Sequence, residues 1–142
     1  MINRDLYLNQ LLRFIDKPLI KVITGIRRSG KSVMLTLLHD NLIERGIEAE
    51  RIIHLSLDSL EYAALNSAEE LYRYVKEKAG AGKRCYLLLD EIQEVDQWEK
   101  AVNSLFTDLN ADIFISGSNS HLLSSELSTY LAGRYEIGRA HV

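Results

Sequence analysis

The chain has 142 residues, 46% of them hydrophobic and 26% charged, which is typical of a single globular domain with a core of its own. Its formal net charge of −3 does not indicate nucleic acid as a partner. No apolar stretch approaches the roughly 20 residues of a membrane span, and the N-terminus lacks a signal-peptide pattern, so we expect no membrane partner and a cytoplasmic location. The only cysteine, Cys85, opens an apolar run, which favours a buried thiol.

Hydrophobic periodicity predicts that strands and helices alternate along the chain. In chain order, the pattern predicts a helix over Arg4 to Ile15, a strand over Leu19 to Thr24, a helix opened by Ser32 and capped at Gly46, a strand over Arg51 to Asp58, a helix from the capping box Ser67 to Glu70 up to Gly80, a strand over Cys85 to Asp90, a helix capped by Asp96 with Glu99, a strand over Asp112 to Ser116, and a last helix marked by Leu123, Leu127 and Leu131. This alternation favours an α/β fold, in which helices cover both faces of a parallel sheet.

The most informative motif lies between the first predicted strand and the helix that follows it. Gly25 to Ser32 (GIRRSGKS) matches the phosphate-binding loop G-x-x-x-x-G-K-[ST], which predicts a nucleoside triphosphate as ligand. Backbone N–H groups of such a loop face the phosphates, Lys31 adds a positive charge, and the Ser32 hydroxyl is a ligand for Mg²⁺. The expected nucleotide-binding residues are Gly25, Ile26, Arg27, Arg28, Ser29, Gly30, Lys31, Ser32 and Val33. Whether Arg27 and Arg28 contact phosphate or solvent stays open.

Two acids, Asp90 and Glu91, follow the apolar run that begins at Cys85. Ligands of parallel α/β sheets bind at the carboxyl ends of the strands, so we expect these acids to lie near the phosphate loop. Asp90 is then a second ligand of Mg²⁺, and Glu91 orients and deprotonates the attacking water. The sequence lacks the N-K-x-D segment with which GTPases read guanine, so ATP is the favoured nucleotide.

A third polar cluster, Ser116 to Ser120 (SGSNS), follows the strand predicted over Asp112 to Ser116. If that strand lies between the loop strand and the acidic strand, Asn119 or Ser118 reaches the γ-phosphate and reports its presence. The alternative is a Gly/Ser/Asn turn that only caps the next helix.

These motifs resemble those of prokaryotic AAA-type P-loop ATPases, a family whose members are often known only as ATP-binding proteins. The resemblance rests on GIRRSGKS, LLLDEIQ, ISGSNSHLLSSELSTYLAGRY and the opening NRDLYLNQLL, and it covers Met1 to Tyr135. It implies a three-layer P-loop NTPase core, with Asn119 as the phosphate sensor in addition to the roles given above. Arg134 matches a Gly-Arg of the family, and by this resemblance it reaches a γ-phosphate in cis or, in a homo-oligomer, in trans. A surface arginine is the alternative.

The chain departs from the family pattern after Tyr135, where family members continue into another strand. Their core is followed by a C-terminal portion with a winged-helix segment and a domain of unknown function. Here residues 137–142 (IGRAHV) are the translation of ATCGGAAGAGCACACGTC, which resembles a sequencing adapter. We therefore expect an incomplete ATPase core over residues 1–135, a non-native tail over residues 136–142, and a missing C-terminal effector region. The final strand or strands should also be missing, which would leave the strand Leu19 to Thr24 with an unpaired edge.

Mg²⁺-dependent hydrolysis of ATP to ADP and phosphate is the function that these residues favour. One alternative is a nucleotide-gated switch, which binds ATP tightly, turns over rarely and signals through the effector region. Another is a P-loop kinase, although the arginine-rich lid that such enzymes use is not found in this sequence. A comparison of steady-state with single-turnover kinetics separates the ATPase from the switch.

Overall fold

The computed structural model describes residues 4–24, 28–118 and 134–137. Within these ranges, the strands form one five-stranded sheet in the order β2-β3-β4-β1-β5, and all neighbouring strands are parallel. The strands are β1 (Ile20–Ile23), β2 (Ile52–Ser56), β3 (Cys85–Asp90), β4 (Ala111–Ser116) and β5 (Arg134–Ile137). The helices are α1 (Arg4–Arg13), α2 (Arg28–Glu44), α3 (Ala68–Ala79) and α4 (Trp98–Asp108). The predicted α/β class is therefore confirmed.

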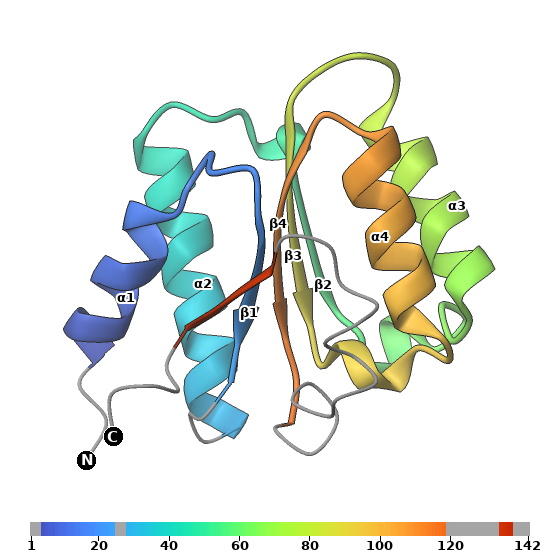
Figure 1. Ribbon diagram of the computed structural model, residues 1–142, viewed down its shortest axis with the longest axis horizontal. Coiled ribbons are helices and arrows are strands. Elements are labelled where there is room, and N and C mark those ends of the chain that lie inside the picture. Colours follow the sequence, from blue (N-terminus) through green and yellow to red (C-terminus); the bar gives the residue numbers. More distant parts are fainter. Residues whose placement is uncertain (1–3, 25–27, 119–133, 138–142) are drawn as a thin grey trace.

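The sheet separates two hydrophobic cores, one beneath each pair of helices. Figure 1 shows α1 and α2 on one face of the sheet and α3 and α4 on the other. Alternate residues of a strand point to opposite faces, so Leu88 and Phe114 pack with α1 and α2, whereas Leu87 and Ile113 pack with α3 and α4. All six residues of β3 are buried, as its continuous apolar run predicts. Among the described helices, none is both long and apolar enough to cross a bilayer.

The last residues of β1 to β4 lie together at one end of the sheet, the end formed by the carboxyl ends of the strands. Ser56 of β2 pairs with Asp90 of β3, and Ile23 of β1 pairs with Ser116 of β4. The segments that follow β1, β3 and β4 contain the three predicted polar clusters. Because these strands are parallel and in this register, the clusters leave the sheet at the same end, as expected.

Capping residues set several helix ends where the sequence predicts them. Ser67 Oγ accepts a hydrogen bond from the Glu70 backbone N–H at the start of α3. After α2, Gly46 has a φ of 95°, and the N–H of Ile47 bonds the carbonyl of Leu42 at 3.1 Å. This backbone reversal favours glycine, because other residues rarely adopt a positive φ. The start of α2 differs from the prediction, since the helix begins at Arg28 rather than at Ser32.

The predicted N-cap of α4 is wrong. Gln97, not Asp96, occupies the cap position, with a left-handed backbone (φ 56°) and no side-chain cap hydrogen bond. The backbone of Asp96 instead pairs with the segment before α3, where its N–H bonds the Asn66 carbonyl at 2.9 Å. This long-range pairing takes Asp96 out of the helix start. The last predicted helix, around Leu123 to Leu131, lies outside the described residues.

The expectation of a missing fifth strand and of an open edge on β1 is also wrong. β5 pairs in parallel with β1, from Ile20 opposite Arg134 to Ile23 opposite Ile137. The strand thus begins before Tyr135 and includes Glu136 and Ile137. A short segment suffices because β1 itself has only four residues to pair. The assignment of residues 136–142 to a non-native tail stays a prediction about their origin.

A buried polar network links the α1–β1 connection to β4 and to the residue before β3. It lies at the end of the sheet opposite the last residues of β1 to β4. Lys21 of β1 has a fully buried side chain, and its Nζ donates to the Asp112 carboxylate and to the Lys17 carbonyl. The backbone N–H of Asp16 donates to the second Asp112 oxygen at 2.7 Å. Arg84, just before β3, donates to the Asp16 carboxylate at 2.9 Å. The network therefore fixes the chain as it enters β1.

Candidate functional site

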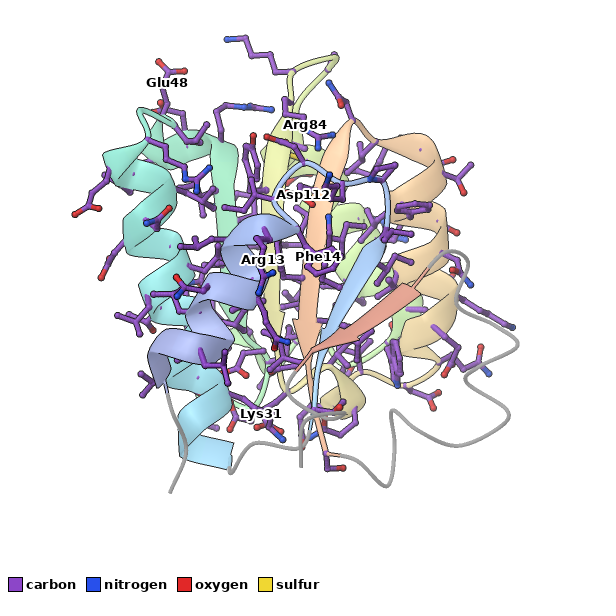
Figure 2. All side chains as sticks on the ribbon, turned by 60° about the vertical axis from the view of Figure 1, so that its left-hand side comes forward. Arg13, Phe14, Lys31, Glu48, Arg84 and Asp112 are labelled. Atoms are coloured by element: carbon purple, nitrogen blue, oxygen red, sulfur yellow. The ribbon has the colours of Figure 1, made fainter. Side chains whose placement is uncertain are left out.

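The lysine of the phosphate-loop motif lies inside the protein. Lys31 belongs to the N-terminal part of α2 and is only 5% exposed. Its Nζ donates a hydrogen bond at 2.7 Å to the carbonyl oxygen of Gly117, the residue directly after β4. Figure 2 shows Lys31 at the end of the sheet opposite Asp112 and Arg84. The ammonium group is therefore held between α2 and the tip of β4.

Asp90 accepts hydrogen bonds from two hydroxyl groups on two different elements. Ser32 Oγ, from α2, donates to Asp90 Oδ2 at 2.6 Å, and Ser116 Oγ, from the end of β4, donates to Asp90 Oδ1. Asp90 is the last residue of β3 and is 3% exposed. Hydrogen bonds to a carboxylate are stronger than neutral ones, so these contacts tie α2, β3 and β4 together at one point.

Glu91 has a left-handed backbone conformation, with φ 57° and ψ 53°. Its backbone N–H donates to Ser116 Oγ at 3.1 Å, and its carboxylate oxygen Oε1 accepts a hydrogen bond from Gln93 Nε2 at 2.6 Å. The residue is 3% exposed. For a residue with a Cβ atom, this backbone region costs of order 1–3 kcal/mol, and residues strained in this way cluster at active sites and ligand-binding segments. The turn keeps the Glu91 carboxylate inside the protein.

The structure brings together the side chains of Lys31, Ser32, Asp90 and Glu91, which the sequence assigns to one site. Gly30 and Val33 are half-buried in α2 beside them. Other predicted site residues fall outside the described part of the chain, either as whole residues (Gly25, Ile26, Arg27 and Asn119) or in their side chains (Arg28, Ser29 and Arg134). Their ligand contacts stay predictions.

Two residues make contacts that the sequence motifs do not predict. Ser116 belongs to the third polar cluster, yet it bonds both Asp90 and the backbone of Glu91. The feature of the sequence that could have indicated Ser116 is that a hydroxyl residue ends an apolar strand, as Asp90 ends β3. Gln93 has no such signal in the sequence, because its contact depends on the left-handed turn at Glu91.

The donor groups fit a divalent cation and a phosphate ligand. The Ser32 hydroxyl oxygen and an oxygen of the Asp90 carboxylate lie only 2.6 Å apart. Mg²⁺ prefers oxygen ligands of these two kinds. Lys31 supplies a positive charge, and Glu91 supplies a further carboxylate at the same edge. These are the groups that phosphoryl-transfer sites use.

The comparison with protein families agrees with the fold. A family model described as an AAA domain matches residues 17–141. Taken with the parallel sheet and the motif at the start of α2, this match defines a nucleotide-binding, ATPase-like domain. The chain belongs to the AAA domain family.

Two long relatives match nearly the whole chain. An uncharacterised protein of Haemophilus influenzae is 47% identical over 136 residues, which cover 95% of this chain and 34% of the relative. An uncharacterised protein of Methanocaldococcus jannaschii is 37% identical over 139 residues, which cover 94% of this chain and 28% of the relative. The chain therefore spans about a third of the length of the curated relatives it matches.

A solved structure with the same fold is that of a DNA polymerase III gamma subunit-related protein from Thermotoga maritima. Its TM-score with this chain is 0.62, and the match covers 95% of this chain and 47% of that one. At 14% sequence identity, the likeness shows the fold alone.

Proposed function

We propose that the chain binds ATP together with Mg²⁺ and hydrolyses the ATP to ADP and phosphate. The observation that carries this proposal is the hydrogen bond of 2.6 Å between Ser32 Oγ and Asp90 Oδ2. It joins the phosphate-loop motif to the acidic end of β3, with Lys31 and Glu91 both buried nearby. The bond brings together two residues 58 positions apart, one from each motif, which supports the proposal that the motifs form one site.

Binding would rest on the residues from Gly25 to Val33. The N-terminus of α2 directs backbone N–H groups and a partial positive charge towards bound phosphate, and the Lys31 ammonium contributes a full charge. Ser32 and Asp90 would hold Mg²⁺ through their oxygens. When bound, the ion neutralises part of the charge on the phosphate oxygens.

Glu91 would act as the general base. Its carboxylate accepts a proton from water, the water oxygen attacks the γ-phosphorus, and the bond from that phosphorus to the β–γ bridging oxygen breaks, with ADP as leaving group. Asn119 is proposed to sense the γ-phosphate, and Arg134 to contact it in cis or, in a homo-oligomer, in trans. An effector region elsewhere in a longer chain would use the energy.

The variant Glu91→Gln tests the assignment of the base, because it keeps the size and most hydrogen bonding of the side chain but removes the proton acceptor. We expect ATP affinity to persist while hydrolysis falls by about 10²-fold or more, the usual worth of a general base. Steady-state phosphate release and calorimetry with Mg-ATP measure the two effects. Glu94→Gln, an exposed glutamate in the next turn, is the matched control. Hydrolysis at the parent rate in Glu91→Gln would mean that water is activated elsewhere.

A further inference from the structure

The carboxylate assigned as the base is held by a neighbour in the following turn. Gln93 lies in the short 3₁₀ turn Ile92–Glu94 between β3 and α4, and its Nε2 donates to Glu91 Oε1 at 2.6 Å. Two acceptor oxygens would repel each other at this distance, so the amide nitrogen is the atom that faces the carboxylate. Gln93 therefore contacts the Glu91 carboxylate directly through a hydrogen bond.

The surroundings of the Gln93 amide argue against a role in packing alone. The side chain is half-buried, and its Oε1 is buried without a hydrogen-bond partner among the described residues. A buried acceptor left without a partner costs about 1–3 kcal/mol. A methionine of similar length would fill the same space without this cost. The contact with Glu91 is thus the interaction that accounts for an amide at this position.

We propose that Gln93 is a positioning residue, whose amide N–H holds the Glu91 carboxylate in the orientation from which it activates water. The inference rests on the proposed function, since it takes Glu91 as the base. The left-handed backbone at Glu91 takes its side chain out of the alternating directions of β3, so the strand geometry does not itself orient the carboxylate. Gln93 contacts that carboxylate from the turn that follows.

Two variants of Gln93 separate hydrogen bonding from packing. Gln93→Met keeps the length and loses the donor, while Gln93→Glu keeps the shape and replaces the donor with an acceptor. We expect both to lower kcat by about 10-fold or more, because small displacements of a reacting group are costly. KM and the calorimetric affinity for Mg-ATP should stay within about twofold, since the contact does not involve the phosphate loop. Glu94→Met, in the same turn and exposed, is the matched control.

A role in packing predicts a different order of effects. Methionine would then be tolerated and glutamate would lower the stability to urea, with no selective loss of kcat. The double variant Glu91→Gln/Gln93→Met gives a second criterion. If Gln93 works only through Glu91, the double variant hydrolyses ATP no more slowly than Glu91→Gln alone.

A measurement on the nucleotide-free protein is independent of turnover. The side-chain amide resonances of Gln93, identified by their loss in Gln93→Met, should move in Glu91→Ala and stay in place in Glu94→Met. Unmoved resonances in Glu91→Ala would overturn the contact itself.

The outcomes distinguish this inference from the proposed function. If Glu91→Gln is slow but Gln93→Met turns over at the parent rate, or if the two losses multiply in the double variant, the role of Gln93 is overturned and the proposed function stands. If Glu91→Gln itself hydrolyses at the parent rate, both are overturned.

Discussion

At the scale of single residues, Lys31 offers the most direct test of nucleotide binding. Its buried ammonium group is the side-chain charge that the motif brings to the phosphates. A hydrogen bond to a charged group contributes about 1.5–3 kcal/mol, so Lys31→Ala should weaken the affinity for Mg-ATP by roughly 10- to 100-fold. Calorimetry measures the change, and urea unfolding checks that the variant is folded. Lys83→Ala, at an exposed lysine before β3, should bind like the parent. Unchanged affinity in a folded Lys31→Ala protein would contradict the phosphate-loop assignment.

Which site residues could be predicted from the sequence depends on whether their contacts are local in the chain. Lys31 and Ser32 could be predicted because their spacing within one motif is itself the signal. Asp90 and Glu91 could be predicted because they end a strongly apolar strand. The hydrogen bond from Ser116 to Asp90 depends on the pairing of β4 with β3, and the contact of Gln93 depends on the backbone turn at Glu91, so neither could be predicted from the sequence.

At the scale of elements, the Lys21–Asp112 ion pair links β1 to β4 inside the protein. Burial lowers the pKa of Lys21 and raises the pKa of Asp112, so the pairing offsets only part of the loss of water around the two charges. Lys21→Met leaves Asp112 buried without its partner and should lower the free energy of unfolding by about 3–5 kcal/mol. The double variant Lys21→Met/Asp112→Leu should recover a large part of this loss.

Urea unfolding of the single and double variants tests this expectation. Arg73→Met is the control, because it removes one partner of an exposed ion pair with Glu70, which contributes little. A loss in Lys21→Met no larger than that in Arg73→Met would show that the buried pair does not stabilise the fold.

Helix α2 and strand β2 are joined by His39 and His54, and the protonation of His54 should make stability depend on pH. The Nδ1 atoms of His39 and His54 lie 2.9 Å apart, so one ring carries the proton and donates it to the other in a hydrogen bond. Burial, and next the charge of His39, lower the pKa of His54 below its ordinary value of 6.5, while Asp90 and Asp40 act in the opposite direction. The stability from this group is therefore complete above pH 6.5 and is lost as the pH falls through the pKa of the folded state.

Urea unfolding at neutral pH and at about pH 5 measures this loss, which begins as the unfolded state takes up a proton near its ordinary pKa. His54→Phe removes the titrating group and should show a smaller drop in the free energy of unfolding between the two conditions. An equal drop in parent and variant would assign the pH dependence to other groups.

The elements differ in how far local pattern determines them. The strand β3 has the bounds predicted for it, Cys85–Asp90, because an apolar run that is buried on both faces of a sheet is a strong local signal. The start of α4 is decided by the pairing of Asp96 with the segment before α3, and β5 exists because β1 offers it an edge. Such long-range pairings cannot be predicted from the local hydrophobic periodicity.

At the scale of the whole molecule, β5 completes the sheet next to the strand that leads into the phosphate loop. A chain that ends at residue 133 would leave the N–H and C=O groups of β1 unpaired along one edge. We expect this shortened chain to unfold at lower urea concentration and to aggregate, as followed by light scattering. A chain that ends at residue 137 keeps β5 and is the matched control. Equal stability and solubility of the two chains would show that the β1–β5 pairing contributes nothing.

At the left-handed turn of Glu91, the residue that suits the backbone differs from the residue that the proposed reaction requires. Glycine adopts this backbone without strain, so the fold alone would favour glycine at position 91. Hydrolysis as proposed requires a carboxylate at the same place. In a search for more stable versions of this protein, glycine at position 91 would therefore be selected for a higher melting temperature and would abolish turnover.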